Sequence, residues 1–189
     1  MALYTKVLQI VAHTLEIPLD QVYLSDSHTS KIANASPTAA SIGSDVYGMV
    51  AMQACQAIKS RLDVLKKNLI AANPNGPTPP WKDLVNQAFF ERVSLSEHAF
   101  YKTPVSGYNF DTKSGVPFNY FTTGAACSEV EVDVLTGDHR VLRSDIVMDA
   151  GTSLNPMVDI GQIEGAFVQG AGWLTVEELT WGDKSHPWI

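Results

Sequence analysis

Residues 128–148 have the sequence SEVEVDVLTGDHRVLRSDIVM and decide the fold class of the chain. Between positions 129 and 134 three valines alternate with acidic residues, a period of two that is typical of a β-strand with one buried face. A turn signal, Thr-Gly-Asp, follows at 136–138, and a second strand-like run occupies 141–148. The segment therefore predicts an antiparallel hairpin with a buried valine face and a solvent-exposed acidic face.

Helical periodicity surrounds this hairpin, with apolar residues recurring at every third or fourth position. The predicted helices run from about Thr5 to just before Pro18, from Ser36 and Pro37 to about Lys67, from Trp81 to Phe89, and from about Asp159 to Leu174. Two more short strands are expected, at Val22 to Leu24 and at Val93 to Tyr101. The sequence therefore predicts an α+β fold, with mixed helices packed on an antiparallel sheet.

The segment NPNGPTPP at residues 73–80 holds four prolines and one glycine, so we expect a surface loop there. It is the only internal boundary that the sequence indicates, and residues 1–189 are otherwise taken as one domain.

Composition excludes several classes of protein. Hydrophobic residues make up 45% of the 189 residues and charged residues only 17%, below the roughly 25% of ordinary soluble domains, so we expect a large buried surface, part of it an interface. The net charge of -7 argues against a nucleic-acid partner. Cys55 and Cys127 have no ligand-like spacing, which favours a reducing, intracellular compartment over a disulfide or zinc framework. No apolar run is long enough to span a membrane.

Several side chains could carry chemistry, and each has an ordinary structural explanation. Glu129, Glu131 and Asp133 could act as paired carboxylates, but Arg140 and Arg143 on the returning strand favour a solvated, salt-bridged face. The five histidines never occur four residues apart as a helical metal pair would. Both cysteines are expected to be buried, inert thiols.

A serine nucleophile is the remaining enzymatic alternative from the residues alone. Residues 39–43, AASIG, loosely match a nucleophile elbow around Ser41. That motif needs a strand and a sharp turn before the serine, whereas a helix is expected to run through this site. Hydrolase chemistry is therefore disfavoured.

Two segments of small residues are predicted to start helices: SPTAASIGS at 36–44 and GQIEGAFVQGAG at 161–172. The first turn of a helix has unpaired backbone N–H groups, and small residues leave them accessible to an anionic or phosphate-bearing ligand. Close helix packing through the same small residues explains the composition equally well. Neither segment matches a dinucleotide-binding or P-loop pattern.

Four segments resemble the molybdenum-binding region of the xanthine dehydrogenase and aldehyde oxidase family, and the resemblance extends from Leu3 to Leu179. They are SPTAAS at 36–41, GAACSEVEVDVLTGDHR at 124–140, SDIVMDAGTSLNP at 144–156 and DIGQIEGAFVQGAG at 159–172. VSLSEHAFYKTP at 93–104 and the pair Gly107-Tyr108 are more similar to xanthine dehydrogenases than to aldehyde oxidases.

The resemblance implies an oxidoreductase of purine catabolism, a molybdenum hydroxylase that converts hypoxanthine and xanthine to urate. It implies a molybdenum-molybdopterin cofactor, with FAD and iron-sulfur clusters elsewhere in the parent enzyme and NAD or oxygen as electron acceptor. It also implies a cytoplasmic homodimer, with the peroxisome as an alternative location.

The resemblance also assigns residues to the cofactor site. By motif, Ala39, Ala40 and Ser41 would approach the cofactor, with Ala40 near the metal but not a side-chain ligand. Gln162 would hydrogen-bond the cofactor, and Glu164 is expected to be structural.

Three departures from the family pattern limit this expectation. The chain begins Met1-Ala2-Leu3 where the family reads Gly-Gln-Gly-Leu, and Gly43 replaces a common serine. The family's Gly-Glu-Pro-Pro segment, with its general-base glutamate, would lie beyond Ile189. We therefore expect a fragment that is not catalytically competent alone. The alternatives are an aldehyde oxidase-type hydroxylase and a non-catalytic cofactor-binding or structural module.

Overall fold

The computed structural model describes residues 2–32, 34–35, 37–104, 107–180, 182 and 184–185. The chain divides into two compact units, Met1–Pro117 and Phe118–Ile189, which we describe separately. Residues 73–80 form the expected loop, largely exposed, but it lies inside the first unit. The proline-rich segment is therefore a connection between helices and does not separate compact units.

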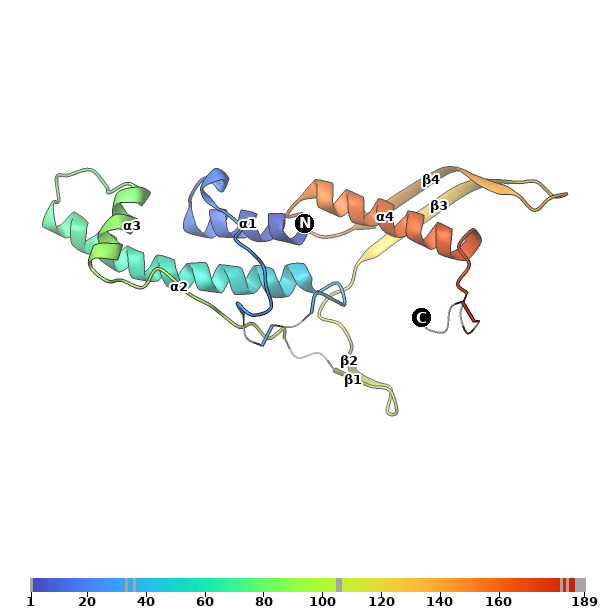
Figure 1. Cartoon of the computed structure of the whole chain (residues 1–189), viewed down its shortest axis with the longest axis horizontal. Helices are drawn as coiled ribbons and strands as arrows, with labels where there is room; N and C mark the ends of the chain where they lie inside the picture. Colours follow the sequence, from blue (N-terminus) through green and yellow to red (C-terminus); the bar gives the residue numbers. More distant parts are fainter. Residues whose placement is uncertain are drawn as a thin grey trace. The chain divides into compact units, whose positions relative to one another are not determined.

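Two helices that run in the same direction organise the first unit: α1 at Ala2–Leu15 and α2 at Gly43–Ala72 (Figure 1). Gly48 is buried between them, and a Cβ added there would lie 2.9 Å from Cδ1 of Ile10. The missing side chain thus permits the helices to pack closely. Near the end of α1, Lys59 Nζ of α2 donates to Glu16 Oε1 at 2.6 Å.

The hydrophobic core lies further along α2, where α3 at Trp81–Phe90 packs against it. Leu62, Leu65, Leu84 and Ala88 form this core, and Leu62 is only 2% exposed. The segment after α3 is anchored beside it by a salt bridge of 2.9 Å between Arg61 Nη2 and Glu97 Oε2. The start of α2 lies outside this core.

The remaining elements of the first unit are small. They are the 3-10 turn η1 at Leu19–Gln21 and the antiparallel strands β1 at Gly107–Asn109 and β2 at Ser114–Val116.

The second unit contains the predicted hairpin and one helix. Strand β3 at Thr123–Val132 pairs antiparallel with β4 at His139–Asp149, and α4 follows at Pro156–Thr175. Glu129 pairs with Arg143 and Val130 with Val141, so Leu142 is an extra residue that forms a β-bulge. The hairpin is confirmed, and β3 begins before the predicted position 128.

The expectation of a buried valine face is wrong for this chain. Residues of both strands are almost all exposed, and Val134 in the turn is 90% exposed. No helix among the described residues packs extensively on either face of the hairpin. The alternating pattern indicates that one face of the hairpin is suited to burial. That face is buried only where another element covers it.

Other predicted elements also differ from the structure. The expected strands at 22–24 and 93–101 do not form, because neither extended segment has a strand beside it in the described chain. Helix α2 begins at Gly43 and not at Ser36 or Pro37, and Ser36 lies outside the described residues. Helix α4 begins at Pro156, three residues before the predicted start.

Helices α1 to α4 and the antiparallel strand pairs β1–β2 and β3–β4 confirm the predicted α+β class. None of the helices in the described ranges has the length and apolar character needed to cross a membrane.

Candidate cofactor-binding site

The segment before α2 has an unusual backbone. Ala40 and Ser41 both have left-handed conformations, with φ of 56° and 57°. This conformation costs roughly 1–2 kcal/mol for each residue other than glycine, so consecutive instances are uncommon. Such strain is found mainly where the surroundings or a ligand impose it. The strain therefore marks residues 39–41 as a candidate ligand contact.

The start of α2 also lacks a side-chain cap. Its N-cap residue is Ile42, which makes no capping hydrogen bond, and the first backbone bond of the helix runs from Val46 N to Ile42 O at 2.9 Å. The first-turn N–H groups of a helix carry partial positive charge and point away from it. Residues 39–41 are exposed beside them.

Several small residues lie around this helix start. A shallow depression is lined by Pro37, Thr38, Ala39, Ile42, Gly43, Val46 and Tyr47. A Cβ added to Gly43 would lie 3.3 Å from Cδ2 of Leu3 and 3.8 Å from Cγ2 of Thr38. The bare backbone at Gly43 thus fits a crowded position. Backbone donors beneath small side chains suit an anionic group such as a phosphate, so these residues fit a phosphate-bearing cofactor.

The start of α4 is built differently. Asn155 is its N-cap, and its side chain accepts from Val158 N at 3.3 Å. Pro156 has no N–H to offer, and Ser153 Oγ donates to Asp159 Oδ2. The helix therefore supplies its own cap, which bonds the N–H of Val158. The prediction that 161–172 is an open helix start is wrong, because α4 begins five residues earlier than Gly161.

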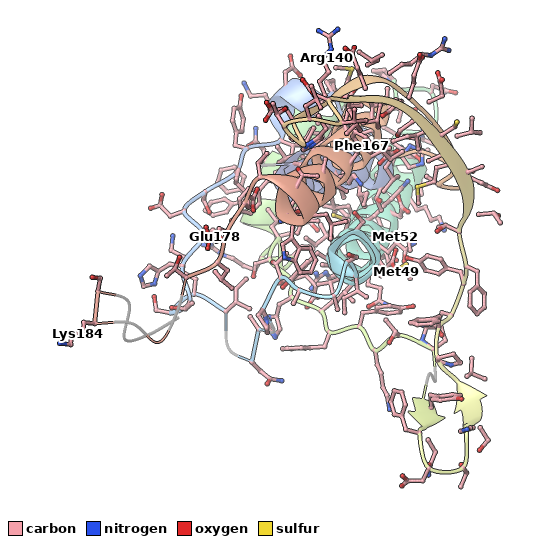
Figure 2. The ribbon with its side chains drawn as sticks, turned by 90° about the vertical axis from the view of Figure 1, so that its right-hand side faces the viewer. Met49, Met52, Arg140, Phe167, Glu178 and Lys184 are labelled. Atoms are coloured by element: carbon pink, nitrogen blue, oxygen red, sulfur yellow. The ribbon has the colours of Figure 1, made fainter. Side chains whose placement is uncertain are left out.

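Gln162 lies in the second turn of α4 and is exposed. Its amide side chain, rather than the backbone, is the group that could bind a ligand. Cβ atoms added at Gly161 and Gly165 would meet no described atom within 4 Å. Close packing through these glycines therefore has no support within the described residues. Figure 2 shows the Phe167 side chain on the same helix.

The acidic face of the hairpin is a salt-bridged surface, as the sequence favours. Arg140 Nη2 of β4, a residue labelled in Figure 2, pairs with Glu131 Oε2 of β3 at 2.8 Å. Arg143 pairs with Asp145 at 2.8 Å and not with Glu129 across the strands. Within the described ranges no three His, Cys, Asp or Glu residues come together as metal ligands would.

The alternative nucleophiles gain no support. No strand precedes Ser41 in the described part of the first unit, so the nucleophile-elbow geometry is missing. Burial raises the pKa of the Cys55 thiol, which disfavours the thiolate. Cys127 is exposed on β3, contrary to the expected burial, because the hairpin is not covered in this chain.

Sequence reasoning missed the part of α1 that supports this site. Leu3 lies beside Gly43, and Lys6 Nζ donates to Ser44 Oγ at 3.2 Å. Gly48 was the available signal, since a glycine inside a long helix indicates close approach of another element. The left-handed pair at Ala40 and Ser41 has no comparable signature, because alanine and serine usually adopt right-handed conformations.

Comparison with known proteins identifies the family of the chain. The family model described as "Molybdopterin cofactor-binding domain" matches residues 2–187. A xanthine dehydrogenase/oxidase of Felis catus is 53% identical over 177 residues, which cover 94% of this chain and 13% of the relative. That of Gallus gallus is 48% identical over 184 residues, covering 97% and 13%.

A xanthine dehydrogenase of Dictyostelium discoideum is 51% identical over 180 residues, with 94% of this chain and 13% of the relative covered. The chain thus spans 13% of the length of each of these relatives. The chain belongs to the molybdopterin cofactor-binding domain family.

Proposed function

We propose that this chain forms one wall of the molybdopterin site of a xanthine dehydrogenase-like enzyme, which hydroxylates the purines hypoxanthine and xanthine to give urate. The observation that carries the proposal is the start of α2. There, an uncapped helix follows the left-handed residues Ala40 and Ser41, beneath small side chains. The identity of about half of all aligned residues with xanthine dehydrogenases supports the same substrate class.

The residues of this chain would bind and orient the cofactor. Backbone N–H groups around Ala39, Ala40 and Ser41 would donate to it, and the short side chain of Ala40 would leave room near the metal. The amide of Gln162, in the second unit, would supply a further hydrogen bond. When bound, the molybdenum centre supplies the oxygen-transfer and redox chemistry that these side chains lack.

The other requirements of the reaction would be met by further polypeptide. The second unit exposes large apolar side chains, including Val147 at 75% and Leu174 at 81%, which would be covered in a complete enzyme. Iron-sulfur clusters and FAD would carry electrons from the site to NAD or oxygen. The assembly would be a homodimer in the cytoplasm, or alternatively in the peroxisome.

Analysis of the natural polypeptide that carries this chain tests the proposal. We expect stoichiometric molybdenum and pterin, and formation of urate from xanthine. Bound pterin with aldehyde oxidation but no urate would instead identify an aldehyde oxidase-type enzyme. Bound pterin without either activity would identify a non-catalytic binding module, and absence of pterin would refute the proposal.

A hydrolase is tested separately with the Ser41→Ala variant. Any esterase activity of the natural polypeptide should persist in this variant, because the structure gives Ser41 no nucleophile-elbow geometry. Complete loss of a measured esterase activity would favour the hydrolase.

A further inference from the structure

The start of α2 is held from outside the helix. Lys6 Nζ, on α1, donates to the hydroxyl oxygen of Ser44, the second residue of α2, at 3.2 Å. Both residues are half-buried. Next to this contact, Leu3 of α1 lies against the bare backbone of Gly43. Two positions on α1 therefore touch the first two residues of α2.

A second contact fixes the alignment of the two helices. Ile10 follows Lys6 by one helical turn, and Gly48 follows Ser44 by the same step. Ile10 reaches within 2.9 Å of where a Cβ of Gly48 would lie. Because each pair is four residues further along, one face of α1 meets one face of α2 in register. The Lys6–Ser44 contact is thus part of a packed interface, between the Leu3–Gly43 and Ile10–Gly48 contacts.

Lys6 places a positive charge close to the N-terminal end of α2, where the first turn also carries the acidic Asp45. A cation at this position favours an anionic group placed against the same helix end. Lys6 contacts the hydroxyl of Ser44, and the residue before it, Gly43, has no side chain.

We propose that Lys6 is a positioning residue, which acts through Ser44 to hold the start of α2. By fixing that start, it keeps Ala40 and Ser41 in the left-handed conformation in which their backbone would meet the cofactor. The inference rests on the proposed function for the identity of the ligand. The positional role of Lys6 can be measured independently of the ligand.

The test uses four variants of the natural polypeptide that carries this chain: Lys6→Met, Lys6→Arg, Ser44→Ala and Lys59→Met. Lys59 is the matched control, because it is the lysine that joins α2 to Glu16 after α1, at 2.6 Å. Hydrogen exchange is followed by mass spectrometry for residues 37–46 and, as a folding control, for residues 58–69. The rate of pterin release is measured by fluorescence.

We expect Lys6→Met and Ser44→Ala to speed both exchange at 37–46 and pterin release by about tenfold, the loss expected for one hydrogen bond to a charged donor. Combining them should add little, because both remove the same contact. Lys6→Arg should restore slow exchange, and Lys59→Met should resemble the wild type.

The inference is overturned if Lys6→Met leaves exchange at 37–46 unchanged, or if exchange at 58–69 rises equally. It is also overturned if Lys59→Met has the same effect as Lys6→Met. A wild-type polypeptide without pterin would refute the proposed function instead, and exchange at 37–46 would still decide the role of Lys6.

Discussion

Helices α2 and α4 both carry small residues near their starts, yet they begin in opposite ways. Helix α4 caps itself through Asn155 and begins with Pro156, which has no N–H to satisfy. Helix α2 has Ile42 at the cap position and is held instead by α1. A self-capped helix has few donors left for a ligand, whereas an externally held helix keeps them available. Composition alone does not distinguish the two cases.

The largest expected effect comes from separating α1 from α2. In Gly48→Leu the new side chain would have to displace Ile10, so we expect a local loss of about 1–3 kcal/mol and release of the Lys6–Ser44 contact. Hydrogen exchange across residues 43–55 measures this loss. The matched variant is Gly161→Leu, where an added Cβ meets no described atom within 4 Å. If Gly161→Leu sped exchange around its own position as much as Gly48→Leu does across residues 43–55, close packing at Gly48 would not explain the loss.

Removing the cap of α4 should have a smaller effect. Asn155→Ala deletes the side chain that accepts from Val158 N, and loss of such a cap costs about 1 kcal/mol. We expect faster exchange at residues 156–160 and no change at 37–46. If exchange at residues 156–160 stayed at the wild-type rate, the Asn155 side chain would not be acting as the cap of α4.

The sequence predicted the parts of the fold that local pattern controls. The hairpin and helix α3 follow directly from residue alternation and helical periodicity. The later start of α2, at Gly43, could not be foreseen, because the left-handed residues Ala40 and Ser41 depend on support from outside the segment. The exposure of the valines could not be foreseen either, because it depends on which elements cover the hairpin.

The candidate site, too, was only partly predictable from the sequence. The motif SPTAAS pointed to residues 39–41 as cofactor contacts, and the structure adds the left-handed conformations of Ala40 and Ser41. Gln162 was identified by resemblance, but its surroundings were wrongly expected to be a helix start. Lys6 was missed altogether, because a contact between residues 38 positions apart leaves no local pattern.

The smallest expected effect concerns pH at the opposite end of the α1 and α2 interface. The hydrogen bond and charge of Lys59 lower the pKa of Glu16 below its ordinary value of 4.5. The stabilisation by this pair should therefore be fully present above pH 4.5 and be lost as the pH falls through the lowered pKa. Because both side chains are at the surface, the effect should be small.

Comparison of the wild type with Glu16→Gln measures this pH effect. Exchange at the end of α1 should differ between them at neutral pH and converge in acid. A difference that persisted well below the lowered pKa would show that Glu16 acts through something other than its charge.

The most direct test of the central claim is the pterin content of Ala40→Val in the natural polypeptide, with Ala72→Val at the other end of α2 as control. A β-branched side chain strongly disfavours the left-handed conformation that Ala40 adopts, whereas Ala72 is helical and exposed. We predict that Ala40→Val loses most of its pterin while Ala72→Val keeps it. Full pterin content in Ala40→Val would contradict the account.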